Sequence, residues 1–209
     1  MRNKEFLEKR CLHTLFLISK KDPMKFKFLL FLTTALPIFL LDQLTKMSII
    51  QNVKLGQTIE IFPHFFDIVH YTNKGAAFGV FSSLPDILRV PLFYILSTAA
   101  TLVVLYFLIH LPIAKKGLLL SLNFILGGAM GNLFDRIFRG EVVDFLSLHW
   151  YNQWTTWTLW QWQWRFKLEW PAFNVADMAI STATVLLMIL ILKGEDFSSS
   201  VKGPPAKGD

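Results

Sequence analysis

The chain has 209 residues, of which 53% are hydrophobic and only 17% are charged. An average soluble domain is about 25% charged, so this composition argues against a disordered chain and against an ordinary soluble globule. The net charge is +6. Because it accompanies long apolar segments, we read it as a sign of contact with lipid rather than with nucleic acid. A single cysteine, Cys11, excludes an internal disulfide framework.

Four apolar segments organise the chain, at residues 28–50, 91–111, 117–138 and 172–192. Each has about 20 residues, the length with which a helix crosses roughly 30 Å of hydrocarbon. Only an α-helix satisfies its own backbone hydrogen bonds there, so we predict an all-α membrane protein with a bundle of four transmembrane helices. Three regions are expected: a basic N-terminal extension, the membrane domain and a disordered tail, at residues 1–27, 28–193 and 194–209. A start of translation at Met24 is an open alternative.

Most of the 21 Lys and Arg residues lie in residues 1–27, in the 112–116 turn and in the tail that begins at Lys193. The positive-inside rule assigns these segments to the cytoplasm. We therefore expect both termini in the cytoplasm and both long loops, 51–90 and 139–171, on the outer face. The N-terminal residues are not expected to be a cleaved signal peptide, because the apolar run after them is too long and lacks a clear small-residue cleavage site.

The two outer loops carry strand patterns. Residues 57–72 alternate partially and are rich in β-formers, which predicts a short strand or hairpin. Residues 81–90 predict a short amphipathic helical turn capped by Ser83. All seven tryptophans lie between Trp150 and Trp170, and from Trp160 onward every second residue is apolar. This period of two predicts a strand with an aromatic and a polar face, interpreted as a ribbon that dips into the outer leaflet. A simple aromatic belt anchor is the alternative.

Two acidic residues are candidate catalytic groups: Asp144, just past the third segment, and Asp177, near the start of the fourth. If these two segments are antiparallel neighbours, both carboxyls lie near the outer face. In a poorly hydrated site two carboxyls share one proton, and such a pair can hydrolyse a peptide bond. A solvated surface carboxylate for Asp144 and a charge favoured by the helix dipole for Asp177 remain as alternatives. The five histidines form no zinc-protease motif, so no metal is expected.

Further ionisable residues lie inside the predicted spans. Asn132, Asp135 and Arg136 are spaced i, i+3 and i+4, so they share one helix face. Asp42 and Lys46 are one helical turn apart in the first segment. Ionisable groups are costly within a membrane and are usually functional, although a structural ion pair explains Asp42 and Lys46 equally well.

Four blocks of the sequence resemble the lipoprotein signal peptidases, also called signal peptidase II, which are bacterial intramembrane aspartyl proteases. The blocks are LDQLTK (41–46), YTNKGAAFGVF (71–81), GGAMGNLFDRIFRGEVVDF (127–145) and PAFNVADMAI (171–180). They occur in the order of the family, and the similarity covers residues 24–193. The Trp-rich stretch 150–168 departs from the pattern, because family members usually reach the PAFN block in fewer residues.

The resemblance implies that Asp144 and Asp177 are the catalytic dyad, acting without metal or cofactor, and that Asn73 and Arg136 hold polar groups of the substrate. It implies that a further set of residues shapes or supports the site: Asp42, Lys46, Gly75, Asn132, Asp135 and Asn174. By the same resemblance the first outer loop supplies a small periplasmic β-cradle and a short periplasmic helix. The implied substrate is a prolipoprotein whose lipobox cysteine carries diacylglycerol. It is cleaved just N-terminal to that cysteine, at the outer face of the bacterial inner membrane.

Two other classes of function stay open on the residues alone. A proton-coupled transporter would use Asp42, Asp135 and Asp177 as relay groups, but it leaves Asp144 without a role, and no inverted repeat is visible. A membrane scaffold would use the charged groups only to pair helices. Diacylglyceryl-prolipoproteins and membrane phospholipid are the expected partners, nucleic acid is not, and we expect a monomer.

Overall fold

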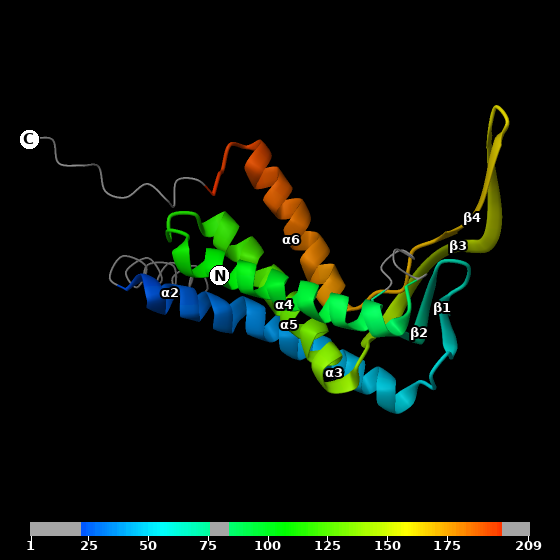
Figure 1. Cartoon of the computed structure of the whole chain (residues 1–209), viewed down its shortest axis with the longest axis horizontal. Helices are drawn as coiled ribbons and strands as arrows, with labels where there is room; N and C mark the ends of the chain where they lie inside the picture. The colour runs from blue at the N-terminus through cyan, green and yellow to red at the C-terminus, as the bar shows by residue number, and fades with distance from the viewer. Residues whose placement is uncertain (1–21, 76–83, 198–209) are drawn as a thin grey trace, which may run out of the picture.

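The computed structural model describes residues 22–75 and 84–197, in which the helices form an elongated bundle with a sheet at one end (Figure 1). The helical elements are α2 (Pro23–Leu30), η1 (Phe31–Ala35), α3 (Leu36–Asn52), α4 (Asp86–His110), α5 (Lys116–Arg139) and α6 (Val175–Leu192). The strands are β1 (Thr58–Phe62), β2 (Phe66–Asn73), β3 (Val142–Leu159) and β4 (Trp162–Glu169). The π-helical segment η1 joins α2 and α3, so these three elements form one helical rod.

Four helices in the described part of the chain are long and apolar enough to cross a membrane, as the four apolar segments predict. The first of them begins at Pro23 rather than at residue 28. Asp22 caps this end, because its side chain accepts a hydrogen bond from Lys25 N at 3.1 Å, and proline is favoured at the first helical position. Local capping therefore extends the helix into the basic region that the sequence analysis treats as an extension.

The short helical turn predicted over residues 81–90 lies partly outside the described residues, and its described part is not a separate element. Residues 86–90 are the first turns of α4, and the N-cap position is Pro85. Ser83 lies outside the described residues. Once a helix starts at Asp86 it propagates into the apolar run, because adding a residue costs less than starting a new helix. Pro91 lies early in α4, where it removes only one intrahelical hydrogen bond.

The sheet is antiparallel in the order β1-β2-β3-β4. Strands β1 and β2 form the hairpin predicted over residues 57–72, with Thr58 opposite Val69. Strand β3 corrects two expectations. Asp144 lies in a strand rather than in a loop, and the sheet, which was expected from the first outer loop, also contains strands from the second outer loop. Asp144 pairs with Tyr71 of β2. These two segments are distant in the sequence, so the residues around Asp144 do not by themselves predict the pairing.

Strands β3 and β4 continue as a long hairpin that projects away from the helices (Figure 1). The strand predicted from Trp160 onward is confirmed, but it begins at Trp162. Leu159 pairs with Trp162, which leaves Trp160 in the connecting turn with a positive φ of 56°.

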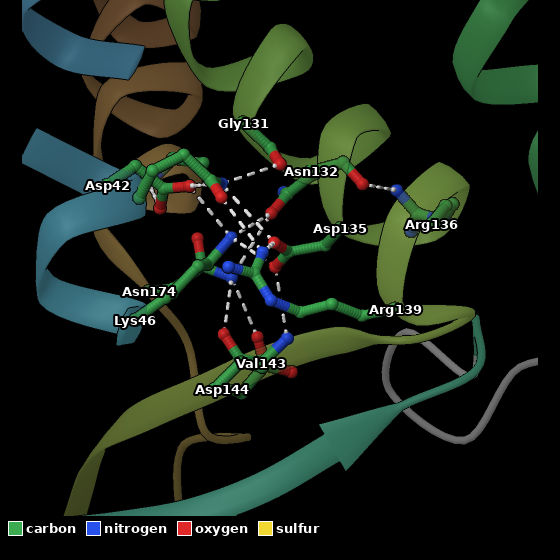
Figure 2. A network of polar contacts seen from close by, with 12 residues as sticks. Asp42, Lys46, Gly131, Asn132, Asp135, Arg136, Arg139, Val143, Asp144 and Asn174 are labelled. Carbon is green, nitrogen blue, oxygen red and sulfur yellow. Dashed lines mark hydrogen bonds and ion pairs between the residues drawn. The ribbon is translucent and has the colours of Figure 1, made fainter. Parts of the chain in front are cut away.

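Helix α5 packs closely against its neighbours through glycines. A Cβ atom on Gly127 would lie 2.6 Å from the carbonyl oxygen of Ala35, and one on Gly128 would lie 2.5 Å from that of Ala176. A larger side chain at either position would push the helices apart. The close packing brings α3, the last turns of α5 and the first turn of α6 together beside β3, where the polar residues gather (Figure 2).

Candidate active site

A buried ion cluster joins α3 and α5 (Figure 2). The Nζ atom of Lys46 lies 2.8 Å from Asp42 Oδ2 and 2.8 Å from Asp135 Oδ2, and all three side chains are fully buried. Lys46 also donates to Asn132 Oδ1 at 3.0 Å, so the three N–H donors of the ammonium group all have acceptors. The ion pair considered for Asp42 and Lys46 is therefore present, with Asp135 as a third member.

The two carboxylates of this cluster also hold the elements that carry the catalytic candidates. Asp42 Oδ1 accepts a hydrogen bond from the backbone of Ala176 in α6 at 2.9 Å. Asp135 Oδ2 accepts one from the backbone of Val143 in β3 at 3.2 Å. Buried carboxylates are tolerated when they are paired and hydrogen-bonded, and here that requirement ties α6 and β3 to α3 and α5.

Two members of this network were not predicted from the sequence, Gln43 and Arg139. Gln43 Nε2 donates to Asp42 Oδ2 and to the carbonyl oxygen of Gly131, both at 3.1 Å, and to Asp135 Oδ1 at 3.2 Å. Arg139 forms an ion pair with Asp135 and donates to Gln43 Oε1 at 2.8 Å. The i, i+4 spacing of Asp135 and Arg139 is a usable signal, whereas the role of Gln43 depends on the contact of α3 with α5.

Asp144 on β3 and Asp177 in the first turn of α6 line one cavity of about 260 Å³. Asn174 connects them. Its Nδ2 donates to Asp144 Oδ1 at 2.8 Å, and its Oδ1 accepts a hydrogen bond from the backbone of Asp177 at 3.0 Å. The structure thus brings together the two carboxyls that the sequence analysis singled out from separate segments.

Asp177 has the helix-capping role considered for it and also faces the cavity. Its Oδ2 accepts a hydrogen bond from the backbone of Asn174 at 3.2 Å in a capping box, and its Oδ1 accepts one from Asn132 Nδ2 at 2.8 Å. The oxygen of the same Asn132 amide accepts from Lys46, which directs the Nδ2 group toward Asp177. These two donors fix the orientation of the Asp177 carboxyl at the helix N-terminus.

Asp144 is not the solvated surface carboxylate considered as its alternative, because it is only 4% exposed. Burial raises the pKa of Asp144 to about 7, and the negative charge of Asp177 acts in the same direction. Hydrogen bonds from Asn73 Nδ2, at 3.2 Å, and from Asn174 oppose this rise in pKa, as does the positive charge of Lys46. Within the described ranges neither carboxylate of the pair forms an ion pair with a lysine or arginine. Asp144 is therefore suited to holding a proton near neutral pH.

The candidate residues form two layers around the cavity. Six of them line it: Asn73, Gly75, Asn132, Arg136, Asp144 and Asp177. The other four are buried behind it: Asp42, Lys46, Asp135 and Asn174.

Apolar residues that were not predicted complete the cavity wall, among them Phe93, Trp170 and Ile180. Gly75 has a φ of +114°, and a Cβ on it would lie 2.3 Å from the ring of Phe93, so the position needs glycine. Two carboxyls at the edge of a partly apolar cavity are an arrangement suited to general acid–base hydrolysis.

Comparison with known proteins identifies the family. The family model for signal peptidase (SPase) II matches residues 34–193. The lipoprotein signal peptidase of Syntrophotalea carbinolica is 38% identical over 167 residues, which is 79% of this chain and 91% of that protein. The lipoprotein signal peptidase of Listeria monocytogenes serotype 4a is 33% identical over 167 residues, which is 80% of this chain and 96% of that protein.

A solved structure has the same fold. It is described as a bacterial membrane enzyme structure obtained by the in meso method at 2.3 Å resolution. The TM-score is 0.61 with 28% sequence identity, over 87% of this chain and 94% of the solved chain. With the family match across most of the four-helix region, these similarities establish that the chain belongs to the signal peptidase II family of aspartic peptidases.

Proposed function

We propose that this protein removes the signal peptide from prolipoproteins whose lipobox cysteine carries diacylglycerol, and that Asp144 and Asp177 are its catalytic dyad. Membership of the family supports cleavage of lipoprotein signal peptides. The observation that carries the dyad is the convergence of the two carboxyls on one cavity, linked by Asn174.

The environments of the two carboxyls suggest different roles. Asp144, with its pKa raised to about 7 by burial, is the protonated member in this proposal. Asp177, at a helix N-terminus and hydrogen-bonded by Asn132 and Asn174, is the ionised member. Separate environments of this kind are what allow one carboxyl to act as acid and another as base at the same pH.

Hydrolysis would then proceed by proton transfers between each carboxyl and the water or substrate. Asp177 takes a proton from water as its oxygen attacks the scissile carbonyl carbon, and Asp144 gives its proton to the carbonyl oxygen. As the tetrahedral intermediate collapses, the C–N bond breaks and the leaving nitrogen receives the proton held by Asp177. A hydroxyl of the intermediate returns a proton to Asp144, which restores the starting state of the dyad.

The position of the cavity suits a substrate that stays anchored in lipid. The cavity is lined by residues from the end of α5, the start of β3 and the start of α6, and these elements meet at the sheet end of the helices (Figure 1). Apolar side chains such as Phe93 and Ile180 in its wall favour an apolar part of the substrate beside the carboxyls. Together with cytoplasmic termini, as the distribution of Lys and Arg predicts, this geometry would open the site at the outer face of the cytoplasmic membrane.

The test is conversion of a diacylated prolipoprotein by the purified protein, followed by the change in product mass. We expect cleavage immediately before the lipidated cysteine, and much less cleavage of the same precursor without diacylglycerol. Equal cleavage of both precursors would contradict the proposed substrate. A proton-coupled transporter should tolerate Asp144→Asn, and a scaffold should tolerate both Asp144→Asn and Asp177→Asn, so the same assay with these variants separates the three functions.

A further inference from the structure

The tip of the β3–β4 hairpin exposes large apolar side chains at the sheet end of the molecule. Trp160 in the turn is 97% exposed, and its neighbours Leu159 and Trp162 are 70% and 69% exposed. The hairpin extends well beyond the rest of the sheet (Figure 1). Large apolar groups gathered on one projecting element indicate a surface that another phase or molecule covers.

The register of the hairpin separates apolar from polar positions. Leu159 is opposite Trp162, and Thr158 is opposite Gln163. Residues directly opposite each other in an antiparallel pair share one face, so Leu159 and Trp162 lie on one face near the tip, and Thr158 and Gln163 lie on the other. By the same register Trp154 lies on the polar face. Every second residue of a strand points to the same side, so residues 154, 156 and 158 share one face. The aromatic and polar faces predicted from the sequence are therefore present at the tip, with Trp154 as an exception.

The base of the hairpin adjoins a membrane-crossing helix. The hairpin leaves the bundle where α5 ends and returns where α6 begins, so its base lies at the end of two of the four apolar helices. At that base Trp170 is exposed, and exposed apolar residues such as Met178 and Val185 continue along α6. In Figure 1 the hairpin runs sideways from this end of the bundle, across the general direction of the helices. Lipid that surrounds α6 would therefore lie next to the hairpin.

We propose that the β3–β4 hairpin binds phospholipid, with its apolar face and Trp160 at the boundary between headgroups and acyl chains, on the membrane surface where the cavity opens. Tryptophan is well suited to this boundary because its ring is apolar and its N–H is polar. Since Trp170 belongs both to the hairpin base and to the cavity wall, a hairpin held at this depth also holds the catalytic cavity at a constant depth.

The native tryptophans allow a direct test. All seven lie between residues 150 and 170, so the intrinsic tryptophan fluorescence of the full chain reports on this hairpin and its base alone. We would reconstitute the protein in phosphatidylcholine nanodiscs, with lipids brominated near the headgroup or near the bilayer centre, and add iodide to the water. We expect bromine near the headgroup to remove most of the emission, bromine at the centre to remove less, and iodide to remove little.

Three single variants and one double variant locate the signal within the hairpin. Trp160→Phe should remove emission that is sensitive to bromine near the headgroup, whereas Trp150→Phe reports on the base. Replacing Leu159 and Trp162 by Gln should make the remaining emission more accessible to iodide. Trp154→Gln, which changes the opposite face, is the matched control and should not.

A hairpin that lies in water would give the opposite result for the unmodified protein. Its emission would be quenched by iodide as strongly as that of a free tryptophan derivative and would not respond to brominated lipid. That outcome overturns lipid binding and would favour a soluble partner for this face. Because the readout is fluorescence rather than cleavage, it leaves the proposed peptidase function untouched.

Discussion

Two pairs of aspartates a short distance apart in this protein have opposite electrostatic settings. Asp42 and Asp135 share the ammonium group of Lys46, at 2.8 Å from each, and all three side chains are sealed from solvent. Asp144 and Asp177 are held instead by the amides of Asn73, Asn132 and Asn174 and border a cavity. The same side-chain type is thus paired with a cation in one pair and held by neutral amides beside a cavity in the other.

The difference shows two ways in which one protein holds buried carboxyls in place. A lysine in direct contact with Asp144 and Asp177 would favour the ionised form of both carboxyls and remove the acid that the proposed mechanism needs. Amides orient a carboxyl without adding net charge. Lys46 orients Asp177 indirectly. It donates a hydrogen bond to the oxygen of Asn132, and the nitrogen of that amide donates to Asp177. We expect the first pair to matter for folding and the second for chemistry.

The largest expected effect is the loss of cleavage in Asp144→Asn or Asp177→Asn. Each change should lower kcat/KM by at least about 10³-fold, because an acid–base pair acts as a unit. The double variant should be scarcely worse than either single one. Asp86→Asn, which alters an exposed carboxylate, is the matched control and should cleave normally. Thermal unfolding should show that the two dyad variants fold, so a loss of activity with an unchanged Tm would separate chemistry from folding.

Breaking the first pair should instead weaken the fold. Lys46→Met leaves buried Asp42 without a cation and Asp135 with Arg139 alone, and removing one partner of a buried ion pair costs about 3–5 kcal/mol. Lys74→Met, which breaks an exposed pair with Asp86, should change the free energy of unfolding by no more than about 1 kcal/mol. Chemical unfolding in detergent measures both variants. Equal stability of the two would show that the buried cluster is not the structural element inferred here.

Helix packing offers an intermediate effect. Gly128→Ala places a Cβ 2.5 Å from the backbone oxygen of Ala176, which should shift α6 and lower stability by about 1–3 kcal/mol. Gly117→Ala is a matched control, because its Cβ meets only the flexible end of Leu190 at 3.0 Å. Because Asp177 is on α6, Gly128→Ala should also lower kcat. A normal kcat would indicate that the dyad does not depend on this contact.

The smallest expected effect is a shift in pH dependence. With Asp144 as the acid, kcat/KM should fall as the pH rises through about 7, the pKa of Asp144. Asn73→Leu removes a hydrogen bond that lowers this pKa, so the alkaline limb should move to higher pH by a fraction of a pH unit. An unmoved or lowered limb would argue against Asp144 as the proton donor.

The same carboxyl should affect stability with a definite sign. The pKa of Asp144 in the folded protein, about 7, lies above its ordinary value of 3.8. The folded state therefore binds the extra proton between these values, and stability falls as the pH rises from about 4 to 7. Asp144→Asn should flatten this part of the stability profile, measured as the unfolding midpoint at several pH values.

Sequence reasoning succeeded where one short segment contains the whole signal. The four apolar helices follow from run lengths alone, and β1 and β2 follow from β-formers in residues 57–72. It failed for β3, because the pairing of Asp144 with Tyr71 joins two distant segments. It also failed to find Gln43, whose three acceptors lie partly on another helix.

The sequence by itself determined which groups are available: four helices of membrane length, the aspartates in their boundaries and a segment, 150–170, that contains every tryptophan. Only the tertiary structure decided which aspartates became a sealed ion cluster and which became neighbours at a cavity. The physical reason is that a carboxyl's charge state depends on burial and on groups within a few ångströms. Here those neighbours, Lys46 for Asp135 and Asn73 for Asp144, come from distant parts of the chain.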